Sequence, residues 1–261
     1  MKARANGIDL HYTIEGNGPW LVMSHSLACN LAMWDAQAAA LAQRFKVLRY
    51  DMRGHGRSDV PGGAYTLELL AADAKGLCDA LGVREAHWVG ISIGGMIGQT
   101  LALAEPRLLK SLVLANTTSR NPPEAAPMWA ERIRIAETQG MEAHVEPTLA
   151  RWFTEGFRNA HPERVAPIAD AIRSTPVAGF VGCCHAIPKI NLTARLKEIR
   201  CPALVIAGEH DPGATVAVAR TIHENLPGSE LVVLPAAHLS NVEQPEGFNR
   251  ALVQFYDRIG A

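Results

Sequence analysis

Short apolar runs recur along the chain and alternate with longer segments in which apolar residues are spaced three and four apart. The runs predict strands at about 8–16, 20–25, 45–51, 86–90, 111–117, 203–208 and 230–235. The spaced patterns predict helices at about 33–43, 66–82, 92–105, 215–225 and 245–259. Apolar strands that alternate with helices are typical of a mostly parallel sheet with helices on both faces, so we expect an α/β fold.

The alternation of strands and helices stops between about 121 and 190. This segment has no strand-like run, but it has several helical patterns that carry tryptophan and phenylalanine. We expect a helical insertion that covers the C-terminal edge of the sheet. The predicted organisation is therefore an α/β core formed by 1–118 and 192–261, with a helical lid or cap at 119–191. A length of 261 residues suits one large domain of this kind.

Composition narrows the class of protein further. Hydrophobic residues make up 48% of the chain and charged residues 20%, and the net charge is −1, so nothing predicts a nucleic-acid or anionic-membrane surface. No signal peptide or membrane-spanning run is recognisable. The five cysteines lack zinc-site spacing, which predicts reduced thiols and a cytoplasmic protein. The sequon at Asn116 then has no meaning for glycosylation.

The stretch "VGISIGGMIGQ" places Ser92 between Gly90 and Gly94, where a strand is expected to turn into a helix. This G-x-S-x-G pattern is the nucleophile elbow, in which a tight turn holds the serine outward and its flanking residues must be small. The simpler alternative is a serine that caps the N-terminus of a glycine-rich helix.

Two further residues follow later strands. Asp211 lies after "ALVIAG", and His238 lies after "ELVVLP". Open parallel sheets place their sites at the carboxyl ends of the strands. A serine nucleophile needs a base that is oriented by an acid, and the order Ser92, Asp211, His238 supplies both. Taken singly, Asp211 is also a good turn residue before a proline, and His238 also suits a packed loop.

An acyl-transfer site of this kind needs donors for an oxyanion. The backbone N–H of Ile93, directly after the serine, is one candidate, and the N–H of Leu27 in "HSLACN" is the other, with Ser26 beside it. The glycine-rich "DMRGHGRSD" lacks the G-K-[ST] ending of a phosphate loop, and we expect His55 within it to be structural. No metal is expected, because the ten histidines form no zinc motif.

Together, these motifs resemble the α/β-hydrolase superfamily over essentially the whole chain. Three segments are similar to 3-oxoadipate enol-lactonases: "GISIGGMIGQ" with "LVLANTTSR", "GFVGCCHAI" with its cysteine pair Cys183 and Cys184, and "AAHLSNVEQPEGF". Serine at the Ser26 position also fits that family. The chain departs from it at Pro188 and Lys189, where an arginine and an acid are usual.

The resemblance implies a cofactor-free serine hydrolase that opens 3-oxoadipate enol-lactone to 3-oxoadipate in the β-ketoadipate pathway. Its partner would be a small molecule with a carboxylate, which requires a cation or several donors in the pocket. Ser26 and the lid aromatic Trp129 are further candidates for substrate contact, ahead of Trp152. The cationic candidates in or beside the lid are Arg120, Arg132, Arg134, Arg151 and Lys189.

Other functions fit the same fold. A general carboxylesterase, a cofactor-free perhydrolase or haloperoxidase, and a carbon–carbon bond hydrolase would use the same three residues. A ligand receptor on this scaffold would bind without turnover, because fold does not fix function.

Overall fold

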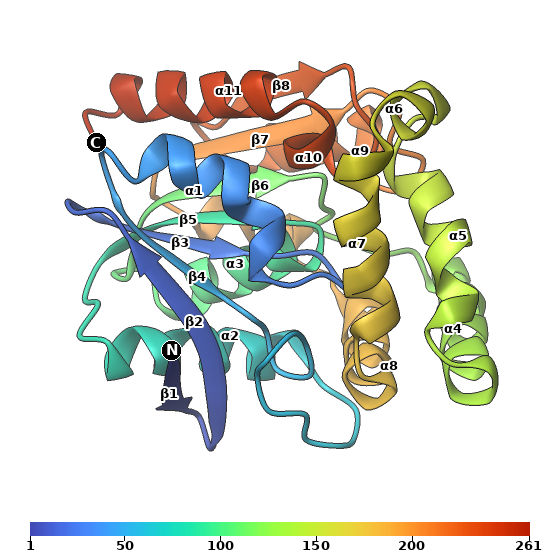
Figure 1. Ribbon diagram of the computed structural model, residues 1–261. Helices are drawn as coiled ribbons and strands as arrows, with labels where there is room; N and C mark the ends of the chain where they lie inside the picture. The colour runs from blue at the N-terminus through green and yellow to red at the C-terminus, as the bar shows by residue number, and fades with distance from the viewer.

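The computed structural model describes residues 1–261 and contains one eight-stranded sheet in the order β1-β2-β4-β3-β5-β6-β7-β8 (Figure 1). The pairs β1–β2 and β2–β4 are antiparallel, and all other neighbours are parallel. This confirms the predicted mostly parallel α/β sheet. The strands are β1 (Lys2–Ala5), β2 (Ile8–Glu15), β3 (Trp20–Ser24), β4 (Lys46–Tyr50), β5 (Ala86–Ile91), β6 (Leu109–Ala115), β7 (Ala203–Gly208) and β8 (Glu230–Leu234).

Helices pack on both faces of the sheet (Figure 1). One face carries α1 (Asp35–Leu41) and α11 (Pro245–Arg258), and the other carries α2 (Leu67–Ala80) and α3 (Ile93–Ala104). The helix α9 (Val216–Asn225) packs beside β7. Two of these helices begin as their sequences predict, because the hydroxyls of Thr66 and Thr215 cap α2 and α9.

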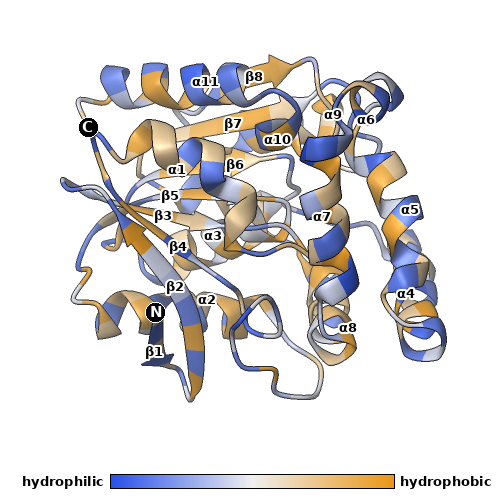
Figure 2. Ribbon diagram, viewed as in Figure 1, coloured by the Kyte–Doolittle hydropathy of each residue, from blue (hydrophilic) through white to orange (hydrophobic).

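The core follows the hydropathy pattern. Every residue of β5 and β7 is buried, as expected of central strands that are covered on both faces. In Figure 2 the central strands are mostly apolar, whereas α11 alternates between apolar and polar bands along its length. That banding is typical of a helix with one buried face. The hydropathy pattern does not predict the short edge strand β1, because "KARA" is polar and mostly exposed.

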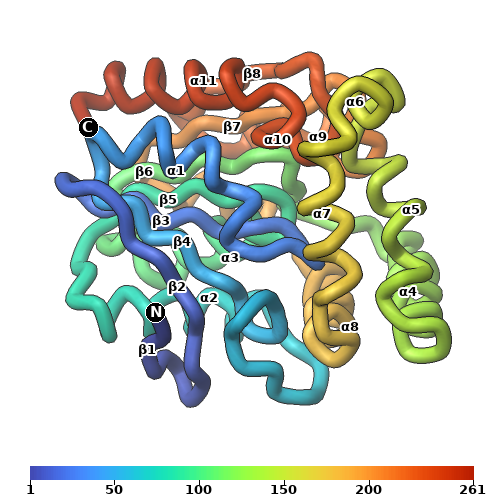
Figure 3. The backbone as a smooth tube through the Cα atoms, in the orientation of Figure 1, coloured from blue at the N-terminus to red at the C-terminus, as the bar shows by residue number.

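Five helices and three short 3₁₀ turns lie between β6 and β7. We call residues 119–191 the lid; its helices stand beside the core, at the carboxyl end of the strands (Figure 3). A backbone bridge between Arg120 and Asn191 joins the two ends of this segment. The helices are α4 (Ala126–Gln139), α5 (Glu142–Trp152), α6 (Glu155–Ala160), α7 (Pro162–Ser174) and α8 (Val177–Ala186), and the turns are η2 (Pro123–Ala125), η3 (Ile187–Lys189) and η4 (Thr193–Glu198).

The helix α8 attaches the lid to the core. The N–H of Tyr65 donates to the carbonyl of Gly182 over 3.0 Å, and Gly179 lies directly against Gly54. Cys183 and Cys184 are fully buried in this helix, and burial raises the pKa of both thiols. The cysteine pair therefore serves packing rather than reactivity.

No helix in the structure combines the length and the apolar character that a membrane crossing requires. His, Cys, Asp and Glu side chains nowhere gather in groups of three or more in a way that suits a metal ion.

The close approach of α8 to the core predicts a specific sensitivity at Gly179. A Cβ at this position would lie 1.9 Å from the Gly54 carbonyl oxygen, so Gly179→Ala forces backbone apart and should cost about 1–3 kcal/mol in the free energy of unfolding. Gly156 in α6 is the matched control, because a Cβ there meets nothing within 4 Å. Gly156→Ala should be neutral or stabilising. Urea unfolding of the two variants checks this, and equal midpoints would contradict it.

Candidate active site

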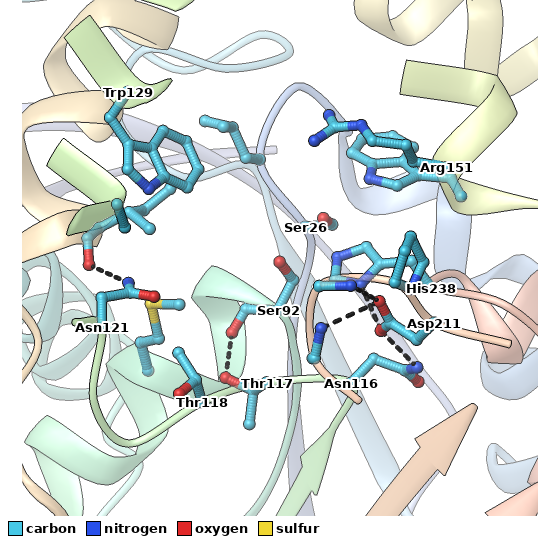
Figure 4. A pocket seen from close by; sticks show the side chains of 18 of the residues that line it. Ser26, Ser92, Asn116, Thr117, Thr118, Asn121, Trp129, Arg151, Asp211 and His238 are labelled. Carbon is cyan, nitrogen blue, oxygen red and sulfur yellow. Dashed lines mark hydrogen bonds and ion pairs between the residues drawn. The ribbon is translucent and has the colours of Figure 1, made fainter. Parts of the chain in front are cut away.

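Ser92 occupies a sharp turn between β5 and α3. Its φ of 57° lies in the left-handed region, which side chains other than glycine rarely adopt. Two bonds to the neighbouring strand exit hold this conformation: the Ser92 N–H donates to the Ala115 carbonyl (2.9 Å), and the Thr117 hydroxyl donates to the Ser92 carbonyl (2.6 Å, Figure 4). The Ser92 side chain makes no capping hydrogen bond, so the simple N-cap alternative is wrong.

The glycines beside Ser92 are required by close backbone contacts. A Cβ on Gly90 would lie 2.1 Å from the Gly94 carbonyl oxygen, and a Cβ on Gly94 would lie 2.2 Å from the Ser24 carbonyl oxygen. Contacts this short exclude any side chain. The strand, the turn and the helix around the serine are therefore in direct backbone contact.

Asp211 and His238 meet at the ends of β7 and β8. The distance from His238 Nδ1 to Asp211 Oδ2 is 2.7 Å, and Asp211 is only 4% exposed. Its other oxygen, Oδ1, accepts the N–H groups of Gly213 (2.9 Å) and Ala214 (3.0 Å). Asp211 is thus both a turn residue and the partner of the histidine.

The carboxylate of Asp211 stays charged in spite of its burial. Burial alone would raise its pKa, but the charge of His238 and the hydrogen bonds from His238, Asn116 and Gly213 outweigh that effect and hold the pKa at about 2. A charged acceptor fixes the proton of the imidazole on Nδ1, which leaves Nε2 as the basic nitrogen. The indole of Trp152 stacks on the ring, with centroids 6.0 Å apart and an interplanar angle of 25°.

A cavity of about 420 Å³ contains these groups and lies between the core and the lid. In Figure 4 the Ser92 hydroxyl points into it, with His238 and Asp211 on one side and Trp129 of α4 across from them. Of the residues predicted for the site, Ser26, Leu27, Ser92, Trp129, Asp211 and His238 line the cavity. Ile93 is fully buried behind it at the start of α3, so only its backbone is available to the site.

Three donors in the segments beside the cavity have no partner in the protein. The N–H groups of Leu27 and Ile93 have no hydrogen-bond acceptor in the protein. The buried hydroxyl of Ser26 also has no partner. Buried polar groups are normally satisfied, so unpaired donors around a cavity indicate that a ligand completes them.

Two histidines hold the Ser26–Cys29 loop in place. His55 Nε2 accepts the Ala28 N–H, and His25 Nε2 accepts the Met52 N–H, both over 3.0 Å. Both rings are fully buried, and Ala28 has a φ of 57°. Because each Nε2 accepts a hydrogen bond, both rings must be neutral. Burial lowers the pKa of both, that of His55 to about 3. His55 lies outside the cavity lining and is structural, as expected.

The structure selects two of the five candidate cations. Arg132 and Arg151 line the cavity, and neither pairs with a carboxylate. The Arg132 guanidinium lies 4.8 Å from the centre of the Trp129 ring, and Arg151 Nε donates to the Pro147 carbonyl over 3.3 Å. The buried indole N–H of Trp129 has no partner either.

The other three candidates lie outside the cavity. Arg134 pairs with Glu131 on the surface, and Arg120 and Lys189 are exposed. The departure from the lactonase pattern at Pro188 and Lys189 also falls outside the cavity lining, although the preceding Ile187 contributes to it.

Asn116 is a site residue that sequence reasoning missed, because it was considered only as a sequon. Its Nδ2 donates to Asp211 Oδ2 (3.0 Å) and to the Ala237 carbonyl (3.2 Å), and its Oδ1 accepts the Ser240 hydroxyl (2.6 Å). It directly follows β6, so the strand-exit rule that singled out Asp211 applies to it equally.

Comparison with known proteins places this geometry in context. The profile of the family described as alpha/beta hydrolase fold matches residues 19–245. The 3-oxoadipate enol-lactonase 2 of Acinetobacter baylyi is 37% identical over 250 residues, which cover 95% of this chain and 93% of that protein. A putative carbamate hydrolase RutD of Stutzerimonas stutzeri is 32% identical over 94% of each chain. The enol-lactonase structure from Burkholderia xenovorans LB400 superposes with a TM-score of 0.95 and 40% identity, covering 98% of this chain and 100% of that one.

The two neutral histidines that hold the Ser26–Cys29 loop, His25 and His55, predict that the fold is sensitive to acid. Unfolded histidine titrates near 6.5 and folded His55 near 3, so below pH 6.5 the unfolded state binds more protons. The stabilisation from His55 is complete above pH 6.5 and is lost as the pH falls toward 3, at about 1.4 kcal/mol per pH unit.

In His55→Gln, the amide oxygen can still accept the Ala28 N–H. Between pH 6 and 4.5, the free energy of unfolding of this variant should therefore fall with pH less steeply than that of wild type, by about 1.4 kcal/mol per pH unit. Urea unfolding of both proteins across this range measures the two slopes. The remaining buried histidines contribute equally to both proteins. Parallel slopes would mean that His55 is not kept neutral by the fold.

Proposed function

This chain belongs to the α/β-hydrolase fold family and is a carboxylic ester hydrolase, and from that premise we propose that it opens the lactone ring of 3-oxoadipate enol-lactone to give 3-oxoadipate. The observation that carries the proposal is the 2.7 Å bond between His238 and Asp211 in a cavity that also holds Ser92 and two unpaired arginines. The similarity to two enol-lactonases supports the same substrate.

Acylation begins at Ser92, which we assign as the nucleophile. Its Oγ attacks the lactone carbonyl while His238 Nε2 takes the hydroxyl proton, and Asp211 stabilises the resulting imidazolium. The tetrahedral intermediate collapses by breaking the bond to the ring oxygen. That oxygen leaves as an enolate, receives the proton from His238 and tautomerises to the ketone. An enolate is a good leaving group, so ring opening is the easier half of the cycle.

Deacylation reuses the same groups. Water loses a proton to His238 Nε2 and attacks the acyl-enzyme carbonyl, and the bond to Ser92 Oγ breaks as the proton returns to it. The product is released with two carboxylates. No cofactor is needed at any step.

The oxyanion of both intermediates is assigned to the N–H groups of Leu27 and Ile93. Their lack of any protein acceptor supports this role, because the donors are free before substrate arrives. One such donor is worth about 10² to 10³ in kcat. We also assign the Ser26 hydroxyl to substrate contact, which is supported by its lack of a partner and its position in the cavity lining.

The free carboxylate of the substrate is assigned to the lid side of the cavity. Arg132 and Arg151 are the cations that line it, and Trp129 Nε1 supplies an unpaired donor. A guanidinium binds a carboxylate through two parallel hydrogen bonds, and partial burial strengthens the interaction. Burial lowers the pKa of Arg151, because it disfavours the charged guanidinium. An anionic ligand beside Arg151 would offset that cost.

The proposal extends to the β-ketoadipate pathway of aromatic catabolism and to a cytoplasmic location. The pathway rests on the enol-lactonase relatives. The location is supported by five cysteines that are all free, four of them buried. The 32% identical putative carbamate hydrolase makes a carbamate the second candidate substrate, which would react at the same serine.

The first test compares wild type with Ser92→Ala on the enol-lactone generated in place from muconolactone, followed by loss of ultraviolet absorbance. Loss of a triad serine lowers kcat by about 10⁶, so the variant should lose nearly all of the wild-type turnover. Ser174→Ala, which alters an exposed lid serine, should behave as wild type.

If wild type does not exceed the spontaneous rate while it hydrolyses a carbamate or a neutral ester, the enol-lactone is the wrong substrate. If Ser92→Ala stays active, Ser92 is the wrong nucleophile.

The second test concerns the carboxylate. Arg151→Gln and Arg132→Gln should each lower kcat/KM for the enol-lactone by about 10- to 100-fold, mainly through KM, because a hydrogen bond to a charged group is worth about 1.5–3 kcal/mol. Turnover of p-nitrophenyl acetate, which has no carboxylate, should change by less than about threefold. Arg134→Gln, whose guanidinium pairs with Glu131 on the surface, is the matched control. Equal losses on both substrates would remove these arginines from carboxylate binding.

A further inference from the structure

Glu243 is a buried carboxylate that plays no part in the mechanism above. It lies at the end of α10 (Ser240–Glu243), is 5% exposed, forms no ion pair and does not line the cavity. Burying a charge without a counter-ion is costly unless several donors satisfy it. Three donors do so here, and they come from two separate parts of the chain.

The first donor belongs to the segment that carries the base, which we call the base loop (residues 235–239). Glu243 Oε2 accepts the Ala237 N–H over 2.8 Å. On the other side of His238, the Leu239 N–H donates to the Trp152 carbonyl over 3.1 Å. The N–H groups of the residues before and after His238 are therefore both held by hydrogen bonds, one to Glu243 and one to the lid.

The other two donors belong to the lid, at the turn between α5 and α6 that we call the lid turn (residues 152–154). Glu243 Oε1 accepts the Thr154 N–H over 3.2 Å and also accepts the Thr154 hydroxyl. The same turn begins with Trp152, whose indole stacks on the His238 imidazole. A further contact from the lid comes from Arg164 of α7, which donates to the Val242 carbonyl.

From these contacts we propose that Glu243 is a positioning residue that locks the lid turn to the base loop and thereby fixes the imidazole of His238. The ring is held between the Asp211 carboxylate and the Trp152 indole, and Glu243 joins the two backbones that set this spacing. The proposal rests on the assignment of His238 as the base.

A carboxylate suits this position better than an amide. Donors approach both oxygens of Glu243, so a glutamine side chain in its place would direct its NH₂ group at one of the two backbone N–H groups and leave that group unpaired. A shift of about 1 Å in a catalytic group costs up to about 10² in rate. If Glu243 only stabilised the fold, its substitution would lower the free energy of unfolding without such a loss of rate.

The main test is Glu243→Gln, assayed with p-nitrophenyl acetate well below the unfolding temperature. We expect kcat to fall about 10- to 100-fold, with KM changed by less than about threefold. The downfield proton NMR signal of the His238 Nδ1–H bonded to Asp211 should shift or broaden, because the ring is no longer held at one distance. Normal kcat and an unchanged signal, with only a lower Tm, would overturn the proposal.

Thr154 gives a second route if Glu243→Gln does not fold. Thr154→Val removes the hydroxyl bond to Glu243, and Thr154→Ser restores it, so kcat should fall several-fold in the first and recover in the second. Thr154 also caps α6, so Thr66→Val, which removes the cap of α2 far from the site, is the matched control and should keep wild-type kcat. Equal kcat in all three would overturn the proposal.

The choice of substrate separates this proposal from the proposed function. If Ser92→Ala is inactive and Glu243→Gln keeps the wild-type kcat, only the positioning role of Glu243 is contradicted. If the enzyme does not turn over the enol-lactone, the proposed function is wrong, but the Glu243 test is still valid because it uses p-nitrophenyl acetate.

Discussion

A hydrogen bond of 2.7 Å joins His238 Nδ1 to the nearly buried carboxylate of Asp211, and the surrounding structure keeps both partners in the required charge state. Asp211 stays ionised because the charge of His238 and the hydrogen bonds from His238, Asn116 and Gly213 offset its loss of water. Its charge fixes the tautomer of the imidazole and leaves Nε2 basic. Since the donors come from the exit of β6 and the loop after β7, the bond requires the parallel strand order of the sheet.

The sequence was sufficient to predict most elements of the core and the three strand-exit residues, because both follow from local rules. Burial on both faces makes the central strands apolar, and parallel strands deliver their carboxyl ends to one edge. Ser92, Asp211 and His238 could therefore be found one by one. The strand β1 was missed for the same reason, since a mostly exposed "KARA" at a sheet edge carries no burial signal.

The lid residues that line the cavity could not be chosen from the sequence. Five lid cations looked alike in the sequence, and only the packing of α4 and α5 separates Arg132 and Arg151 from those at the surface. Asn116 and Glu243 act through hydrogen bonds to residues as distant as Asp211 and Thr154 along the chain. Such partners depend on tertiary structure, which no local pattern encodes.

The division of the cavity wall between two lid helices has a consequence for how this scaffold can change specificity. Trp129 and Arg132 project from α4, which packs against α5 and α8, whereas Trp152 belongs to the turn that is bonded to the base loop. Substitutions on α4 can alter the shape and charge of the pocket while His238 stays in place. Replacement of the whole lid would disturb the histidine too. New substrates are therefore expected to be acquired by point changes on α4, and a transplanted lid would need its matching base loop to remain active.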